Sequence, residues 1–423
     1  MSKNDRAFLR LQYEHGRSAF YTDPISPVFD ADSNQPWWQG QVIETHMFGS
    51  SAASQFLVAG TDVSFSYRAK NPSLALSTFP AVLNFFVPSA FTTLGGVDWW
   101  AIVGAGHGNP QYQFSEDVVK TWRTHKFGFG ANFVRTSWNA VPARVNTIGQ
   151  LSPQTLDAFY QGGVDPASPS SDFTVLTQAF SSQTSRPFSF FNLALYAQDE
   201  WHARSTVTLT LALRAEHYSN PVCQNRCLAR LAGPFEAVSH DPNQPYDQAI
   251  LSNQKQAFEH VDNILWSPRF GFAWQPFGVS HSSVLRGGFG IFYDPLPNGM
   301  LDPFSSSTPT YNSYTVSGNN LTPNEKTSLF KDAAASNQAF LNGFAAGQTL
   351  AQIQAAIANF FPPAINTAAT TMHTPRYQRW SVQWQQAFGA DTSLSIGCSI
   401  QLQWRGHFVP TSVHALDQRH ASG

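Results

Sequence analysis

Side chains that could act as acids or bases are few in this sequence, and their spacing does not favour catalysis. Asp199 and Glu200 are neighbours in a stretch whose alternation predicts a strand, so we expect their carboxylates on opposite faces, where they cannot share a substrate. Arg214 and Glu216 lie two residues apart and share a face, which favours an ion pair bracing a lumenal wall. The 13 histidines are scattered and form no H-E-x-x-H motif. We expect no enzyme activity and no catalytic residue.

The cysteines and glycines give no sign of a metal or phosphate site. Cys223 and Cys227 cannot complete a tetrahedral zinc set alone, and no histidine lies beside them at ligand spacing. We expect them to form a disulfide, because their loop would face an oxidising space; free thiols are the alternative. Cys398 stands alone on a predicted strand. The G-x-G-x-G run at 104–108 lacks the strand-to-helix context of a phosphate loop, so we expect no cofactor and no metal.

Two pairs of adjacent tryptophans could contact a ligand. They are Trp37, Trp38, Trp99 and Trp100, and all four fall in or near long predicted loops. Indole rings in such loops could stack on a sugar or a siderophore. The alternative is that they anchor the protein at a membrane interface or pack the loops against one another.

The composition favours a membrane protein that crosses with strands. Charged residues make up 12% of the 423 residues, about half the level usual in soluble domains, and aromatic residues make up 14%. No window approaches 18 uninterrupted apolar residues, which a spanning helix requires. The net charge of -2 offers no basic surface for a phosphate backbone, so nucleic acid is not an expected partner.

Apolar and polar residues alternate with period two in eleven stretches. The last is typical: Leu394, Ile396, Cys398, Ile400, Leu402 and Trp404 alternate with Ser395, Gly397, Ser399, Gln401 and Gln403. One face of such a strand suits lipid and the other suits water. We therefore predict an all-β, antiparallel transmembrane β-barrel segment, with strands near 5–14, 40–48, 54–67, 111–122, 126–137, 188–201, 206–218, 267–277, 283–293, 375–388 and 392–404.

The connections between these strands alternate between short and long. Short turns on one rim and long loops on the other are typical of outer-membrane barrels, in which the long loops are external. The segment 294–374 is the longest loop and carries a helical insert: Thr349 and Gln352 form a capping box that predicts a helix to about Asn359. Ser152 followed by Pro153 predicts another short helix within a loop.

Several strings in these strands resemble the barrel of TonB-dependent outer-membrane receptors of the Oar-like subgroup, whose members carry a carboxypeptidase-regulatory-like N-terminal domain. They are LYAQDEW at 195–201, LTLALRAE at 209–216, SPRFGFAW at 267–274, VLRGGFGIFYD at 284–294 and RYQRWSVQWQQAFGADTSLSIG at 376–397. The resemblance extends from about residue 5 to residue 406. It implies a protein of the outer membrane that captures a small ligand of the siderophore or oligosaccharide class and takes it up when TonB acts on a plug.

The sequence also departs from that family, so we expect 1–423 to be a partial receptor barrel. No plug, regulatory-like domain, TonB-contacting box or export signal is visible ahead of residue 5, and the family's barrels have 22 strands. We expect an open, curved sheet, with lipid as one partner and the TonB complex as another through the missing N-terminal plug region. A passive pore, a structural barrel and an inactive receptor fragment are the alternatives.

Overall fold

The protein is described by a computed structural model in which most of the chain is placed. The described residues are 3–23, 26–78, 82–87, 90–94, 105–141, 149–153, 174–183, 185–234, 236–239, 241, 243–278, 283–296, 301, 306, 308–317, 326–357, 360–363, 370–389, 392–404 and 414–416.

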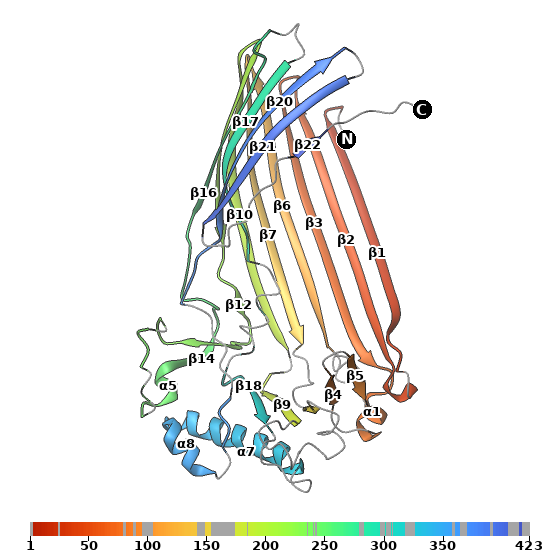
Figure 1. The fold of residues 1–423 in the computed structure, drawn as a ribbon. Coiled ribbons are helices and arrows are strands. Elements are labelled where there is room, and N and C mark those ends of the chain that lie inside the picture. Colours follow the sequence, from red (N-terminus) through yellow and green to blue (C-terminus); the bar gives the residue numbers. More distant parts are fainter. Residues whose placement is uncertain are drawn as a thin grey trace.

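One large antiparallel sheet dominates the structure (Figure 1). Its strand order is β1-β2-β3-β6-β7-β10-β11-β16-β17-β20-β21-β22, and the two-residue β12 also pairs with β10. The eleven long strands are β1 (Asp5–Tyr21), β2 (Ala31–Phe48), β3 (Ala52–Ala69), β6 (Ala105–Trp122), β7 (His125–Val141), β10 (Arg186–Arg204), β11 (Val207–Tyr218), β16 (Leu265–Trp274), β17 (Ser283–Tyr293), β20 (Arg376–Phe388) and β21 (Thr392–Trp404). All eleven predicted strands are confirmed.

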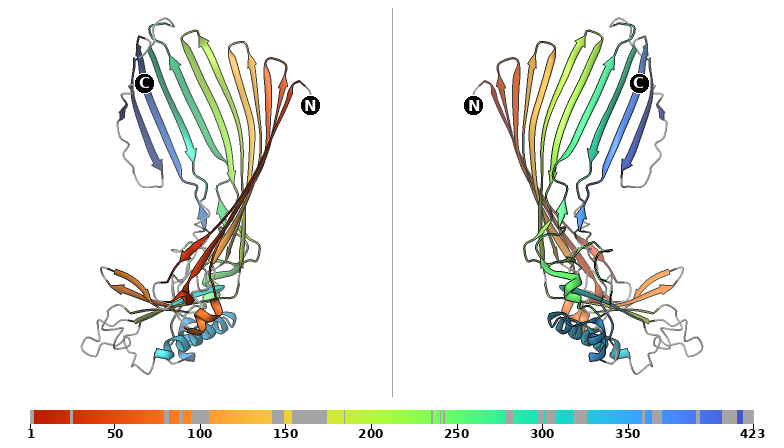
Figure 2. Two further views of the ribbon diagram at one scale, coloured as in Figure 1. Left: turned by 90° about the vertical axis from the view of Figure 1, so that its right-hand side faces the viewer. Right: turned by 90° about the vertical axis from the view of Figure 1, so that its left-hand side faces the viewer.

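The sheet is curved but does not close (Figure 2). Within the described part of the chain, β1 pairs only with β2, and the outer neighbour of β21 is the three-residue β22 (His414–Leu416). The open, curved sheet expected from the sequence is therefore confirmed. We call its two ends the turn end, where short hairpin turns join the strands, and the loop end, where the long connections lie.

A second, folded layer covers the loop end (Figure 1, lower part). It contains a five-stranded sheet in the order β18-β9-β8-β4-β5, in which Leu176 and Tyr314 are buried together with Ala333 of helix α7. Its elements include β4 (Val82–Val87), β5 (Ala90–Leu94), β8 (Gln150–Pro153), β9 (Thr174–Ser181), β18 (Tyr311–Ser317), α7 (Lys326–Ala345) and α8 (Leu350–Ala356). Nearby lie η1 (Pro27–Phe29), α1 (Pro72–Thr78), α5 (Tyr246–Ala249), the hairpin β13 (Leu228–Leu231) with β14 (Ile250–Gln254), and the pair β15 (His260–Val261) with β19 (Thr371–Met372).

The helix predictions have mixed outcomes. The capping box at Thr349 is present, but α8 ends at Ala356, because Ile357 takes an extended conformation. Helix α7, with 20 residues, was not predicted separately. The helix predicted from Ser152 is wrong at its start, since Ser152 and Pro153 belong to β8 and pair with β9; the rest of that stretch lies outside the described residues. No helix in the described residues is both long and apolar enough to cross a membrane.

Trp37 and Trp38 do not lie in a loop, as the sequence suggested, but inside β2. The strand predicted from the sequence began only near residue 40, whereas β2 begins at Ala31. In the structure, the β2–β3 ladder skips Gln35 and Pro36 and resumes at Trp37, so the missing proline N–H falls at a local interruption of the pairing. A strand can therefore run through the proline.

The strand register sorts side chains into an apolar face and a polar face. One row across five strands consists of Leu211, Phe270, Phe289, Trp380 and Ile400. The adjacent row, on the opposite face, consists of Thr210, Gly271, Gly288, Ser381 and Ser399. The apolar face is exposed: Leu211 and Ile400 keep 55% and 50% of their accessible surface. A sheet whose apolar side chains stay exposed is suited to a lipid solvent.

These neighbouring rows give a matched test of the apolar face. In phospholipid vesicles, Ile400→Arg should lower the free energy of unfolding by about 2 to 4 kcal/mol, because it places a charge in hydrocarbon. Ser399→Arg, one residue away on the polar face, should have a much smaller effect. Guanidinium titrations followed by tryptophan fluorescence measure both values. Equal losses would show that the two faces do not meet different solvents.

Candidate functional site

The polar face carries a row of interacting side chains that crosses five strands, from β6 to β16. We call this row, made of Asp117, Gly130, Tyr196, Arg214 and Ser267, the polar belt. Consecutive members lie directly opposite one another in the ladders, so the register alone brings them into line. The belt lies on the face expected to line a lumen.

At one end of the belt, Glu216 accepts hydrogen bonds from several neighbours. Arg214 Nε lies 2.9 Å from Glu216 Oε1, and Ser267 Oγ donates to Oε2 at 3.2 Å. Tyr218 also donates to Oε1, at 3.4 Å. Glu216 is only 9% exposed, and a buried carboxylate is stable when its oxygens are satisfied in this way. The structure thus brings Arg214 and Glu216 together in an arrangement suited to bracing the wall.

At the other end, a tyrosine reaches across a whole strand. Tyr196 donates a hydrogen bond of 2.6 Å to Asp117, although β7 lies between their strands. Gly130 of β7 makes this possible: a Cβ there would lie 2.2 Å from Tyr196 Cε1 and 2.6 Å from Asp117 Oδ1. The ring therefore needs a residue without a side chain beneath it. Sequence reasoning missed this contact; the only local signal was glycine at alternate positions, 128 and 130.

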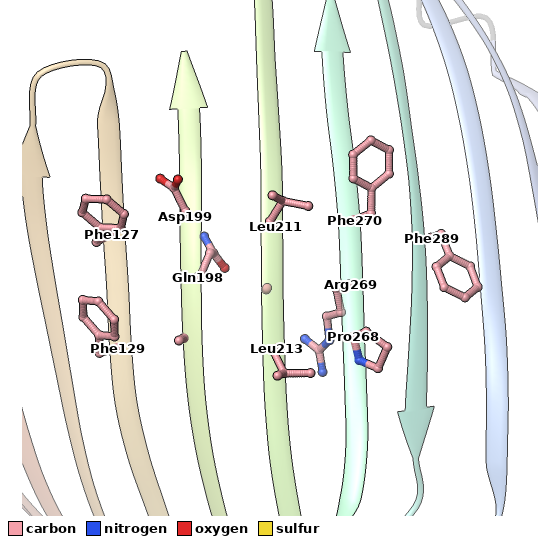
Figure 3. Close-up of a pocket in the computed structure, with 12 residues that line it drawn as sticks. Phe127, Phe129, Gln198, Asp199, Leu211, Leu213, Pro268, Arg269, Phe270 and Phe289 are labelled. Carbon is pink, nitrogen blue, oxygen red and sulfur yellow. The ribbon is translucent and has the colours of Figure 1, made fainter. Parts of the chain in front are cut away.

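A hollow lies on the other face of the sheet (Figure 3). Its volume is about 560 Å³. Phe127, Phe129, Leu211 and Phe270 stand around Ala197, whose small side chain leaves the gap. Asp199 at its edge is held by His125, with Nδ1 2.8 Å from Oδ2. Because apolar rings dominate its lining, the hollow suits a lipid chain better than a polar ligand.

Asp199 and Glu200 take opposite faces, as the alternation indicated. Asp199 lies in the row of Phe127 and Leu211 on the apolar face, and Glu200 pairs with Thr210 on the polar face. The two carboxylates do not form one site.

The cysteines join the wall to the layer at the loop end. Cys223 and Cys227 form a disulfide with 5.8 Å between their Cα atoms, and both residues are buried. Cys223 belongs to β12 (Val222–Cys223) and lies opposite Phe188 of β10, within a cluster that also contains Trp138 and Phe258. The carbonyl of Cys227 accepts a hydrogen bond of 3.0 Å from Thr310 Oγ1.

Trp37 and Trp38 lie on opposite faces of β2, so these two rings do not form one stacking platform. Trp37 lies on the polar face and its indole N–H donates to Thr61 at 3.3 Å. Trp38 points to the apolar face, where its ring covers Gly60. Adjacent residues on a strand cannot grip the same ligand. Trp99 and Trp100 lie outside the described residues.

An ion pair fixes the chain near η1, outside the sheet. Asp30 accepts hydrogen bonds from the backbone N–H of Asp23 at 3.0 Å and from Lys70 Nζ at 3.1 Å. These two bonds lower the pKa of the Asp30 carboxyl, and the same carboxylate raises the pKa of Lys70. In the layer itself, burial raises the pKa of the Tyr314 hydroxyl.

Gly130 and Gly128 provide a matched test of the polar belt. Gly130→Ala should displace Tyr196 and break its bond to Asp117, which should destabilise the protein by about 1 to 3 kcal/mol. Gly128→Ala should be nearly neutral, because a Cβ there would meet its nearest side-chain atom at 3.9 Å. Chemical unfolding in detergent micelles measures the difference. The interpretation fails if both variants lose the same stability.

The disulfide can be tested against Cys398, which is free and exposed. Replacing Cys223 and Cys227 together by Ser should lower local stability at the loop end by about 2 kcal/mol, the value expected for so small a closed loop. Hydrogen exchange of amides in β13 and β14 should therefore accelerate, while Cys398→Ser leaves them unchanged. Unaltered exchange in the double variant would show that the disulfide does not stabilise the loop end.

Comparison with known proteins identifies a family for this chain. Residues 1–398 match the family described as outer membrane beta barrel domain. Among solved structures, the outer membrane transporter YddB from Escherichia coli is 12% identical with a TM-score of 0.49, over 94% of this chain and 38% of that one. The siderophore receptor PiuA from Acinetobacter baumannii is 8% identical with a TM-score of 0.43, over 94% of this chain and 47% of that one. The toluene transporter TodX from P. putida is 10% identical with a TM-score of 0.29, over 95% of this chain and 76% of that one.

No curated protein matches the sequence. The chain spans less than half the length of YddB and of PiuA. The family match covers nearly the whole chain. In a barrel of this family, the apolar face of the sheet is the surface that meets lipid. The chain therefore belongs to the outer membrane β-barrel family, and its place is in the outer membrane.

Proposed function

We propose that this chain forms part of the wall and the ligand-capturing end of a TonB-dependent receptor. The observation that carries the proposal is the asymmetry between the two ends of the sheet. Short hairpin turns join the strands at the turn end, whereas the described parts of the long connections at the loop end form a layer with its own sheet, helices and buried residues. Long external loops are common to outer-membrane barrels, but a layer with its own buried core also offers a surface on which a ligand can be held before it passes the wall.

The sorting of connections supports an orientation with the layer outside the cell and the turns in the periplasm. In that orientation, a small ligand of the siderophore or oligosaccharide class would meet the layer first. The disulfide between Cys223 and Cys227 would then lie in an oxidising space. The function involves capture and transport, with no catalytic step.

The polar face leaves room for a further part of the protein, such as a plug, inside the barrel. Gly271 and Gly288 are neighbours in one row of that face and leave it without side chains there. We propose that a plug, contacted by TonB, fills this space and is supplied by sequence outside the described strands. Further strands would pair with β1 and with the part of β21 that the short β22 does not cover, because unpaired backbone groups cost several kcal/mol each in hydrocarbon.

Dependence on TonB is the decisive property. Cells that carry the whole gene encoding this chain should accumulate one member of a panel of labelled ferric siderophores and oligosaccharides. Deleting TonB should abolish that accumulation, because the plug would no longer move.

A general porin substrate, measured in the same cells, controls for membrane integrity. Accumulation that survives the loss of TonB would contradict the receptor and favour a passive pore.

A further inference from the structure

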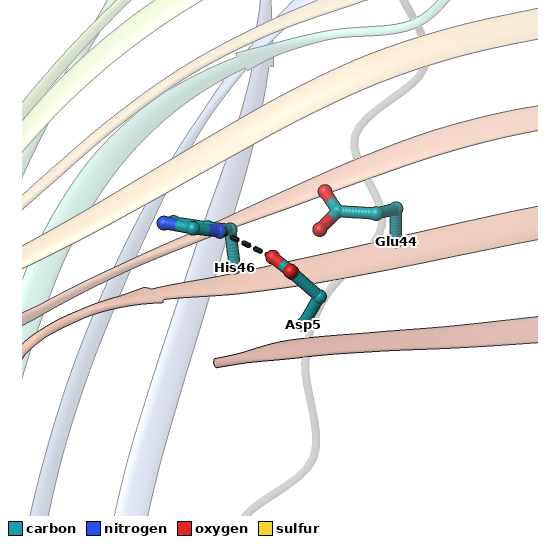
Figure 4. A group of neighbouring side chains, drawn as sticks. All are labelled: Asp5, Glu44 and His46. Carbon is teal, nitrogen blue, oxygen red and sulfur yellow. Dashed lines mark hydrogen bonds and ion pairs between the residues drawn. The ribbon is translucent and has the colours of Figure 1, made fainter. Parts of the chain in front are cut away.

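Three side chains able to bind a metal ion converge on β1 and β2 near the turn end. Asp5 lies directly opposite His46 in the ladder, and Glu44 is two residues from His46, so all three share one face of the sheet. One donor atom from each lies within 4.8 Å of the others. Figure 4 shows the Glu44 carboxylate directed toward the pair formed by Asp5 and His46.

The donor set fits a divalent transition metal. One imidazole nitrogen and two carboxylate oxygens suit Zn²⁺, with water in the fourth tetrahedral position, whereas Ca²⁺ and Mg²⁺ favour oxygen ligands alone. In the structure, His46 Nδ1 lies 2.5 Å from Asp5 Oδ1. An ion between them, with bonds of about 2.0 Å, would set these atoms about 3.3 Å apart, which a small side-chain rotation allows.

The surroundings also favour a cation. The side chains of His46 and Asp5 are only 34% and 31% exposed. Among the described residues, the side chain of Glu44 takes part in no hydrogen bond or ion pair, although the residue is half-buried and its carboxylate lies near that of Asp5. Two neighbouring carboxylates repel each other when both are ionised, and a bound cation removes that repulsion.

We propose that Asp5, Glu44 and His46 form a binding site for Zn²⁺ or a similar divalent transition metal ion, which clamps β1 to β2 at the turn end. This proposal does not depend on the receptor function. It differs from the expectation, drawn from the sequence, of no metal site. That expectation could not include Asp5, which is distant in the chain and joins the others only through the register.

A second histidine–aspartate pair in the same sheet serves as a matched control. His125 and Asp199 also interact between neighbouring strands, with Nδ1 2.8 Å from Oδ2, and both side chains are 27% exposed. Within the described residues, only the cluster of Asp5, Glu44 and His46 gathers three such donors. His125 and Asp199 therefore form a pair without the third ligand.

The experiment uses residues 1–423 in detergent micelles, with Cys398→Ser to remove the free thiol. After dialysis against buffered Zn²⁺, elemental analysis gives the bound metal, and Co²⁺ provides a visible absorption spectrum. Glu44→Gln and His46→Gln should each weaken binding at least roughly tenfold, the scale of loss when even an outer-shell partner is removed. His125→Gln should bind as the parent does. Far-UV circular dichroism checks that all variants keep the sheet.

The proposal is overturned if the parent binds no Zn²⁺, if Glu44→Gln binds it unchanged, or if His125→Gln causes the same loss as His46→Gln. Should His46→Gln disturb the strands, Glu44→Gln decides alone. Glu44 takes no part in the hydrogen bond between Asp5 and His46 and keeps its shape as Gln.

Discussion

The pairing of backbone groups between neighbouring strands is the constraint on which this structure depends. In hydrocarbon, each N–H and C=O must find a partner within the protein, so the chain crosses in continuous ladders. Those ladders fix the register, and the pleat then sends alternate side chains to opposite faces. The row of Leu211 and the row of Thr210 are one residue apart, yet one faces lipid and the other faces the lumenal side.

The two faces of the sheet carry different kinds of side chains, and each kind is stabilised in a different way. Most of the apolar face has to be compatible with lipid, so its large side chains remain exposed. The polar face has to hold charged groups beside a membrane, and it does so by satisfying them: Glu216 with Arg214 and Ser267, and Asp117 with Tyr196. At the loop end, β12 and the disulfide connect the wall to a layer with its own core. In the proposed receptor, this layer would capture the ligand and the wall would surround its passage.

The sequence was sufficient for the strands but not for the contacts between them. Period-two alternation located all eleven long strands, since it reports which face each residue takes. It could not place Asp117 beside Tyr196, or Asp5 beside His46, because those contacts depend on the register of strands distant in the chain. A local signal also misled at Pro153, where strand pairing prevailed over proline's preference for helix starts.

The central claim is that the large sheet separates lipid on its apolar face from water on its polar face. Scanning with a nitroxide spin label along β11 tests this claim most directly. Labels at 208 to 213 in lipid vesicles would be probed by oxygen, which concentrates in lipid, and by a water-soluble nickel chelate. The account predicts oxygen maxima at Leu209, Leu211 and Leu213, and chelate maxima at Thr208, Thr210 and Ala212. Profiles that rise and fall together, or that show no alternation, would contradict it.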